Sequence, residues 1–449
     1  MAVGKGGIVH ARIGKSGEIG FLLCLILAFV AIRLLWLALI YGALDGLIDV
    51  GEATRVALSI ARYGTIGDAY YFGQGPTAHL LPLNPLLAGG VLWLFGPWSA
   101  TASLVLLGLS LGQVLAGYLL VRLVFVRMGA NPLAVRWGTA FLLLVPPFVP
   151  QETLDFRYWE GGSALCLVAC NMLAMIAMDE RGRLRRWDLI AIPALFALNF
   201  FVSPPAGLAV GGCWAIVSLR RLPLASSVAL AGATATALVL IVTPWTLRNL
   251  QVLGEPILLR SNFGIEFALA NHAAAVSGEA PEYVFNDRIQ AIHPAANAAA
   301  RALIRANGEA AYSRVLTDET LAWIKTNPLN FARLWARHVS EIIAPRAWQM
   351  YFSGWEGARA ARASTIAVVQ LTGLLGLAIA LLARRPHTWI PALYIGILTL
   401  FFGFFQPMPR YGFIIYPYFC FLAVEAIIWV GWRCGSETRS TALRKGPRE

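Results

Sequence analysis

The chain has 449 residues, of which 58% are hydrophobic and only 13% charged, and its formal net charge at pH 7 is +12. Soluble globular domains carry about a quarter charged residues, so this composition excludes an ordinary soluble fold and predicts an all-α, multi-pass membrane protein. The Lys and Arg residues gather in short loops and at the C-terminal tail, which is typical of membrane topology and not of nucleic-acid binding, so no nucleic-acid partner is expected.

Apolar segments long enough to cross a bilayer define the expected architecture. A crossing helix needs about 20 residues. The segment 83–96 is short and contains a Gly-Gly pair, so we expect a half-helix or an interfacial helix there. With it, the chain predicts about 10–11 membrane helices. The other candidate segments lie near residues 19–42, 100–126, 133–150, 161–178, 188–203, 204–219, 225–245, 362–383, 388–405 and 412–433.

The basic clusters predict which loops face the cytoplasm. Positive charge is retained on the cytoplasmic side, which places both termini there and the polar pieces 43–99 and 246–361 on the opposite side. The piece 246–361 is expected to be a small, mostly helical external domain. The expected parts are an N-terminal membrane module (1–245, with the external loop 43–99), the external domain (246–361, with helices near 297–306, 310–325 and 331–343), C-terminal membrane helices (362–433) and a basic cytoplasmic tail (434–449).

The loop after the first apolar segment carries two carboxylates beside the membrane. Asp49 and Glu52 open an amphipathic helical pattern over residues 49–64. The helix dipole favours acids at a helix N-terminus, so either residue is explained as a capping acid on a surface helix. The alternative is a general base at the membrane surface, and the pattern by itself leaves both interpretations open.

Two further segments place polar residues at the membrane boundary. The sequence GPTAH at 75–79, followed by two prolines, predicts a rigid turn that ends in His79. This histidine is either a phosphate ligand or proton shuttle, or an ordinary loop residue. The segment 152–160 contains Asp155 and Glu160 as second-choice catalytic or sugar-binding acids, and an interfacial belt explains its aromatic residues.

Two arginines stand at the non-cytoplasmic ends of membrane segments, against the usual charge bias. Arg248 follows the segment 225–245, and Arg410 lies between the last two segments. Snorkelling of the side chain toward lipid headgroups explains either one alone. Both lie beside Pro and aromatic residues, and together they indicate an anionic ligand such as the phosphate of a lipid-linked donor.

No sequence pattern supports a metal or cofactor site. The six cysteines form no CxxC pair, and five of them lie inside apolar segments, which favours small buried residues. HExxH, EF-hand and Walker A patterns are absent, and His272, His293 and His338 are scattered. No metal and no cofactor are therefore expected, although Mg²⁺ binding by paired carboxylates stays open.

The order of these features resembles the GT-C fold of membrane glycosyltransferases, and within it the protein O-mannosyltransferase and aminoarabinose transferase superfamily. The resemblance covers residues 20–430 and begins with Asp49 and Glu52, which precede a short helix with alanine spacing. The further matching motifs, in chain order, are GPTA at 75–78, the Pro-rich re-entry at 82–85, LFG at 94–96, PWTLRN at 244–249, SNFG at 261–264 and RYG at 410–412.

The resemblance implies an inverting glycosyltransferase that takes a sugar from a polyprenyl-phosphate donor to a hydroxyl of a glycan, lipid or protein. Glu52, in preference to Asp49, would deprotonate the acceptor, and Arg248 and Arg410 would stabilise the leaving phosphate. The implied location is a bacterial inner membrane, with the active site on the periplasmic or extracellular side. Substrate contacts are expected from His79, Asp155, Glu160, Asn249, Asn262 and Tyr411.

Two other classes of function are weighed against this one. A transporter or flippase for lipid-linked glycans would carry charged residues within its spans, and the sequence shows few, such as Arg33 and Glu425. A polymerase-ligase for envelope polysaccharide shares the lipid-phosphate chemistry and would use a long polymeric donor. A transporter has no need of Glu52 or Asp49 as acids.

Overall fold

The computed structural model describes residues 15–41, 51–353 and 357–444. Within these ranges the regular structure is helical, apart from an isolated antiparallel β-bridge between Gly67 and Pro76. The predicted all-α class is confirmed. The helices of the membrane bundle are α1 (Lys15–Tyr41), α4 (Ala100–Arg127), α5 (Pro132–Leu144), α6 (Val149–Thr153), α7 (Gly161–Arg181), α8 (Asp188–Val202), α9 (Pro204–Arg221), α10 (Leu224–Leu253), α16 (Arg359–Leu382), α17 (Trp389–Phe402), α18 (Pro409–Phe413) and α19 (Tyr416–Arg444).

Every segment predicted to cross the membrane is helical, but the helices differ in length. In the described residues, five are long and apolar enough to cross a bilayer by themselves, namely α1, α4, α7, α10 and α16. The segment 133–150 is broken, because Pro146 and Pro147 cannot continue α5, and α5 and α6 meet at 71°. Counting that pair gives up to six helices or helix pairs of this length and composition, and α3, α8, α17 and the first part of α19 are shorter apolar helices.

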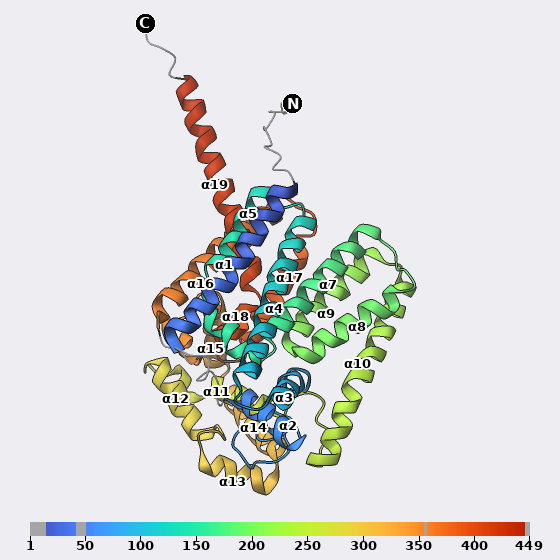
Figure 1. Ribbon diagram of the computed structural model, residues 1–449, viewed down its shortest axis with the longest axis vertical. Coiled ribbons are helices and arrows are strands. Elements are labelled where there is room, and N and C mark those ends of the chain that lie inside the picture. The colour runs from blue at the N-terminus through green and yellow to red at the C-terminus, as the bar shows by residue number, and fades with distance from the viewer. Residues whose placement is uncertain (1–14, 42–50, 354–356, 445–449) are drawn as a thin grey trace.

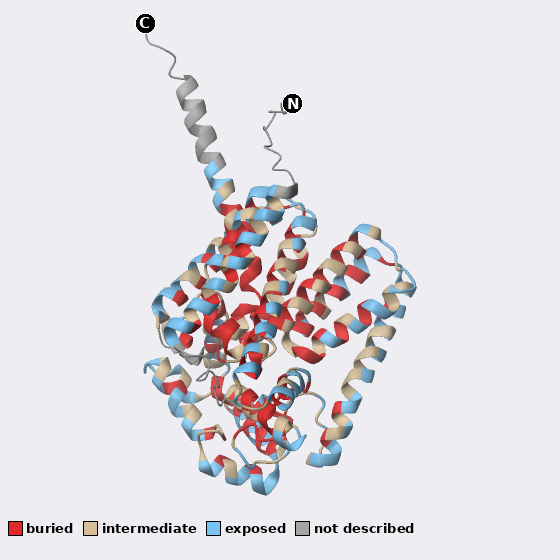
Figure 2. Ribbon diagram, in the orientation of Figure 1, coloured by how far each residue is buried: buried red, intermediate tan, exposed pale blue. Residues whose placement is uncertain are grey.

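The bundle packs most closely where small residues let backbones approach. Helix α16 packs extensively along α19, and α4 along α7. A Cβ at Gly376 of α16 would lie 1.9 Å from the Leu422 carbonyl oxygen of α19, so only glycine permits this approach. Such contacts replace the hydrophobic driving force that is missing between helices in lipid. Figure 2 shows the buried residues concentrated along the middle of the bundle.

A buried ion pair joins α1 to the α5–α6 break. Arg33 Nε donates to Glu152 Oε2 at 2.8 Å, and its Nη1 donates to the Leu143 carbonyl at 2.6 Å. The Tyr118 hydroxyl of α4 donates to the other oxygen of Glu152. Both charges are fully buried, so each needs its partner. The contact fixes the start of the segment 152–160 against the bundle.

The remaining helices form a layer at one end of the bundle, opposite the two termini (Figure 1). We call this the outer layer; it comprises α2 (Glu52–Tyr63), α3 (Leu83–Phe95), α11 (Phe263–Ala270), α12 (Pro281–Ile292), α13 (Ala298–Asn307) and α14 (Glu309–Thr326). Helix α15 (Pro328–Ile343) returns the chain to the bundle against α17. The three helices predicted in this part of the chain, near 297–306, 310–325 and 331–343, correspond to α13, α14 and α15.

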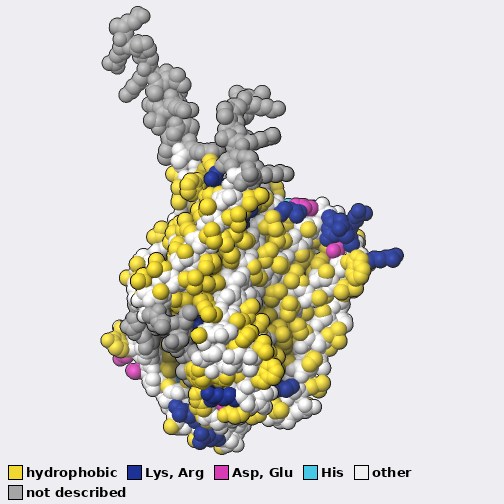
Figure 3. Space-filling model, in the orientation of Figure 1, with side chains coloured by type: hydrophobic (Ala, Val, Ile, Leu, Met, Phe, Trp, Pro, Cys, Tyr) yellow, Lys and Arg dark blue, Asp and Glu magenta, His cyan; other side chains and the backbone are white. Residues whose placement is uncertain are grey.

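The surface agrees with a protein that crosses a membrane. Hydrophobic side chains cover its middle, and Lys and Arg gather toward the two ends (Figure 3). Helix α10 is long and only 11% buried over its most apolar stretch, and it packs mainly against α8. Helix α3, the predicted half-helix, has 13 residues and is too short to cross a hydrocarbon core of about 30 Å.

Candidate functional site

Glu52 is the first residue of α2, so its carboxylate stands at the positive end of the helix dipole. The helix buries Ala53, Val56 and Ala57 against α3 and α4, and Gly64 ends it in the left-handed conformation at φ 68°. This amphipathic pattern leaves the N-terminus free to face the layer formed by α11–α14. Asp49, the other predicted base, lies outside the described residues.

The loop 66–79 runs under Glu52 and is held at both of its ends. Arg248 of α10 donates from Nη2 to the Ile66 carbonyl at 2.6 Å and from Nη1 to the Thr77 carbonyl at 2.7 Å. Glu309, the first residue of α14, accepts hydrogen bonds from the Thr77 hydroxyl at 2.7 Å and from the Ala78 N–H. These contacts tie both ends of the loop to α10 and α14.

His79, at the end of that loop, contacts Glu52 directly. Its Nε2 lies 2.9 Å from Glu52 Oε2, and its Nδ1 lies 3.1 Å from the Tyr70 hydroxyl. His79 and Tyr70 are both buried, with 1% and 2% of their surface exposed. The Tyr70 ring also packs edge-on against the His79 ring, so the imidazole is fixed in position and in direction.

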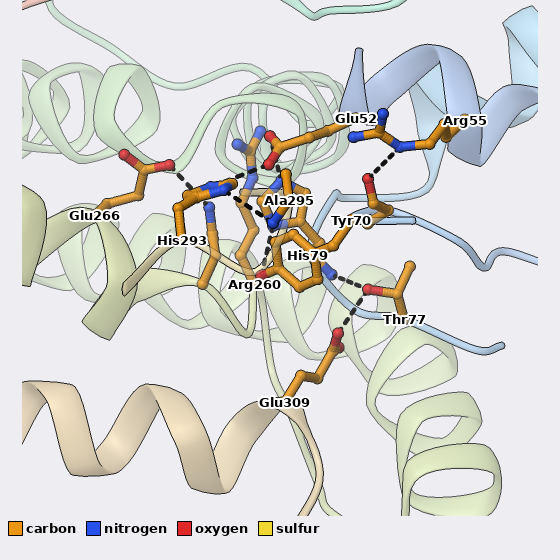
Figure 4. A network of polar contacts seen from close by, with 12 residues as sticks. Glu52, Arg55, Tyr70, Thr77, His79, Arg260, Glu266, His293, Ala295 and Glu309 are labelled. Atoms are coloured by element: carbon orange, nitrogen blue, oxygen red, sulfur yellow. Dashed lines mark hydrogen bonds and ion pairs between the residues drawn. The ribbon is translucent and has the colours of Figure 1, made fainter. Parts of the chain in front are cut away.

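A second histidine reaches Glu52 from the outer layer. His293 directly follows α12, and its Nε2 lies 3.2 Å from Glu52 Oε1. Figure 4 shows the two imidazole rings and the Glu52 carboxylate as one group. No sequence pattern predicts this contact, because His79 and His293 are 214 positions apart.

The two histidines control the pKa of Glu52 and thereby its charge. Burial raises the pKa of a carboxyl group, but the contacts with His79 and His293 outweigh it and hold the pKa of Glu52 well below its ordinary value. Burial lowers the pKa of His293, but the Glu52 carboxylate raises it by more, so the net shift is upward. Burial and the nearby Glu309 and Glu52 carboxylates raise the pKa of Tyr70 well above its ordinary value, so it keeps its proton.

A cavity of about 420 Å³ opens beside this group. Glu266 lines it and helps to raise the pKa of His293, whereas Glu52, His79 and His293 are not among the lining residues. Its walls are mainly apolar and come from α8, α9, α17 and the segment 156–164. The apolar lining residues are Phe156, Trp159, Gly161, Ala164, Phe200, Pro204, Pro205, Leu208, Leu259, Phe263, Phe401, Phe402, Phe405 and Ile414.

Charged groups of both signs face the cavity. Arg260 donates from Nη2 to Glu160 Oε1 at 2.5 Å. The Arg410 guanidinium lies over the Trp159 ring, 4.2 Å from its centroid, and no carboxylate of the described residues lies within ion-pair distance of it. Burial lowers the pKa of Arg410, but Tyr411, Glu266 and Glu160 raise it by more. The net shift of the pKa is upward, so Arg410 is a permanent cation. The cavity therefore offers a cation to an anionic ligand.

The structure brings most of the predicted site residues into two adjoining groups. Glu52 and His79 touch each other, and Glu160, Asn262, Arg410 and Tyr411 line the cavity. Tyr411 is stacked on Phe402, with 4.4 Å between ring centroids.

Three predicted residues lie elsewhere. Arg248 binds the loop carbonyls described above, and Asn249 donates to the Ile257 carbonyl at 2.8 Å. Asp155 begins a 3-10 turn and does not line the cavity, although it helps to raise the pKa of Arg410. The functional roles predicted for these residues stay predictions.

Several residues of the site carry no signal in the sequence. His293 is one of several isolated histidines, and Tyr70, Arg260, Glu266 and Glu309 stand in no recognisable motif. Each reaches the site through a contact between segments that are distant in the chain. Among the described residues, no group of three or more His, Cys, Asp or Glu side chains is arranged to hold a metal ion. The expectation of no metal and no cofactor stays a prediction.

Comparison with known proteins identifies the fold. No protein-family model and no curated protein matches the chain. The apo crystal structure of an oligosaccharyltransferase from Archaeoglobus fulgidus is similar over 98% of this chain, with a TM-score of 0.53 and 15% sequence identity. The structure of the archaeal oligosaccharyltransferase AglB from the same organism, in complex with an inhibitory peptide and a dolichol-phosphate, has a TM-score of 0.49 and 14% identity over 97% of this chain.

This chain spans about half of those proteins, since it covers 53% of each of them. The similarity confirms the predicted GT-C type of membrane fold. It extends over the membrane helices and the outer layer together. At this level of identity the proteins share an architecture, and the chemistry depends on the side chains of the site.

Proposed function

We propose that the protein is a membrane glycosyltransferase that moves a sugar from a polyprenyl-phosphate donor to an acceptor hydroxyl. Two observations support this most directly: the ionised carboxylate of Glu52, and a 420 Å³ cavity, lined by Glu266 near His293, that combines apolar walls with the cation Arg410. An amphiphile with an anionic head fits such a cavity, and a carboxylate beside it fits an acceptor hydroxyl.

Glu52 acts as the general base. It accepts the proton of the acceptor hydroxyl while that oxygen forms a bond to the anomeric carbon of the sugar. The bond between the anomeric carbon and the phosphate oxygen breaks, and its electron pair leaves with the phosphate. Attack from the face opposite the leaving group inverts the anomeric configuration.

Arg410 stabilises the leaving phosphate. Negative charge on the phosphate oxygens grows as the glycosidic bond breaks, and a fixed guanidinium in a cavity poor in water favours that charge. The Trp159 ring holds the Arg410 guanidinium by a cation–π contact. Arg260 is the second cation in the cavity, although Glu160 already compensates much of its charge. We assign the phosphate contact to Arg410 first and to Arg260 second, and Arg248 to holding the loop.

The apolar walls accommodate the lipid chain of the donor. They are formed by helices of the membrane bundle, so a prenyl chain would pass from the cavity along α8, α9 and α17 into the bilayer. Glu266 and Asn262 face the same space and supply acceptors and donors for sugar hydroxyls. We expect this chemistry on the periplasmic or extracellular face of a bacterial inner membrane, because the positive-inside rule puts the outer layer on the non-cytoplasmic side.

The test is a transfer assay in lipid. The purified protein, reconstituted in nanodiscs, is incubated with a panel of radiolabelled polyprenyl-phosphate sugars and a membrane extract as the source of acceptors. We expect the label to move to an extractable acceptor and free polyprenyl phosphate to appear in equal amount. Movement of an unchanged labelled lipid between leaflets, with no transfer, would contradict the proposal and favour a flippase. Transfer of polymeric donors alone would favour a ligase.

A further inference from the structure

The proton positions on His79 and His293 follow from the partners of their rings. The Glu52 carboxylate is ionised and can only accept, so His79 presents an N–H from Nε2, and its Nδ1 accepts from the Tyr70 hydroxyl. The tautomer of His293 is fixed independently. The backbone N–H of Ala295 can only donate, and its nitrogen lies 3.3 Å from His293 Nδ1, so Nδ1 accepts. The proton of His293 is therefore also on Nε2, directed at Glu52.

From this arrangement we infer that His79 and His293 are positioning residues that hold Glu52 for catalysis, so that the base is competent only while the α12–α13 turn is docked on the loop 66–79. The inference rests on the proposed function. His79 Nε2 hydrogen-bonds one oxygen of Glu52 from the loop at 2.9 Å, and His293 Nε2 faces the other oxygen from the end of α12 at 3.2 Å, within ion-pair distance. Each oxygen keeps a second lone pair for the acceptor hydroxyl.

The turn that delivers His293 is itself firmly tied. The segment 293–297 closes on α13 through Arg301, whose Nε and Nη2 donate to the Pro294 and Ala295 carbonyls at 2.8 and 2.9 Å. Arg301 and Arg305 also lie over the Tyr71 ring of the loop 66–79, at 5.7 and 5.0 Å. Displacing the α12–α13 turn relative to α2 thus takes the His293 imidazole away from the base.

Charged and titratable groups from several elements surround Glu52 and affect how its charge depends on pH. Arg55 is on α2, the helix of Glu52, and Tyr70 and His79 are on the loop 66–79. His293 follows α12, Glu266 is on α11, and Glu309 begins α14. Only the histidines lower the pKa of Glu52, against the effect of burial. Because Glu52 must be ionised to act as a base, activity falls as pH drops through its pKa.

Substitution of His293 separates positioning from simple structural support. His293→Leu removes the N–H donor, whereas the amide of His293→Gln can place one near the Nε2 position. We expect His293→Leu to lower kcat by about 10²-fold with little change in the KM for the donor, since misplacing a catalytic group by about 1 Å has an effect of that size. The acid limb of the pH–rate profile of His293→Leu should lie at higher pH than that of the wild type. His293→Gln should restore much of the lost kcat and much of the wild-type pH profile.

The matched control is His272→Leu, a histidine of the same part of the chain with no contact to Glu52. It should leave kcat and the pH profile unchanged. Equal losses in His272→Leu and His293→Leu, or no rescue by His293→Gln, would overturn the inference. So would loss of transfer on chelation with restoration by a divalent cation, because the imidazoles would then be metal ligands with no proton on Nε2.

A measurement without substrate distinguishes this inference from the proposed function. The histidine ring nitrogens are labelled with ¹⁵N and titrated by NMR in the wild type and in Glu52→Gln, with His293→Gln used for assignment. The pKa of His293 should lie above 6.5 and fall in Glu52→Gln. An unchanged titration would disprove the contact, even if transfer is observed. A shifted titration in a protein that transfers no sugar would support the contact and reject the glycosyltransferase.

Discussion

At the scale of single residues, the site depends on how each charge is compensated. The Glu160–Arg260 and Arg33–Glu152 pairs are neutral as units, whereas Arg410 is held by an aromatic ring. A guanidinium with an aromatic partner keeps its full charge for a ligand, and one with a carboxylate partner does not. This difference selects Arg410 as the cation for an anionic headgroup.

Replacement of Arg410 tests that selection. Arg410→Met should reduce transfer by about 10²–10³-fold, the range found when one donor to a developing oxyanion is removed. Arg410→Lys keeps the charge but loses the planar contact with Trp159, so an intermediate loss is expected. The initial rate at saturating donor is the measurement. Arg385→Met, in the Arg385–Glu425 pair at the other end of the bundle, is a control for loss of an arginine; equal rates in both Met variants would reject the role.

The residue types of the site could be predicted only in part. Glu52, His79, Arg410 and Tyr411 follow from their positions at the ends of membrane segments and from the resemblance to a fold family. The loop contacts of Arg248 could not be foreseen, because a backbone carbonyl that accepts from a distant guanidinium leaves no mark in the sequence. For the same reason His293 was missed. Its role depends on how α12 packs on the loop 66–79.

At the scale of helices, the site depends on close packing of α2 on α3, which determines where Glu52 points. The Cβ of an alanine at position 89 would lie 2.6 Å from the Ile60 side chain and 3.1 Å from the Ala57 carbonyl. At the next position, Gly90, there is open space. Helical periodicity predicts these two helices well, but it does not reveal which of two adjacent glycines is at the contact.

This pair of glycines gives a matched test of helix packing. Gly89→Ala should destabilise the protein by about 1–3 kcal/mol through overpacking and should lower transfer, because α2 and Glu52 are displaced together. Gly90→Ala should stabilise it by about 0.5–1 kcal/mol, since alanine is the better helix former. Thermal unfolding in nanodiscs, with transfer activity measured alongside, checks both. Similar behaviour of the two variants would show that α2 does not depend on this contact.

At the scale of the whole molecule, hydropathy predicts a helical membrane protein but does not reveal which of its apolar segments form long, continuous helices. Five to six helices have the length and composition of a span, and the others are shortened or broken near the site by proline and glycine. Irregular backbone at membrane depth is tolerated where protein surrounds it. The short helices α8 and α17 contribute Phe200, Phe401 and Phe402 to the cavity, which a count of apolar residues cannot anticipate.

The sidedness of the molecule is a prediction of the positive-inside rule and can be measured. In a Cys434→Ser background, single cysteines are introduced as Arg305→Cys in the outer layer and Arg185→Cys in the loop between α7 and α8. A membrane-impermeant maleimide should label the first in intact cells and the second only after permeabilisation. The reverse pattern would place the site in the cytoplasm, where a soluble nucleotide sugar would be the expected donor.

The central claim is that an ionised carboxylate at the start of α2 removes the acceptor proton. The most direct measurement is the rate of sugar transfer at saturating donor for the wild type, Glu52→Gln, Asp49→Asn and the double variant, all reconstituted in the same lipid. We predict a fall of about 10²–10⁴-fold in Glu52→Gln, a small effect of Asp49→Asn, and a double variant no slower than Glu52→Gln. Equal rates in all four proteins would contradict the assignment of the base.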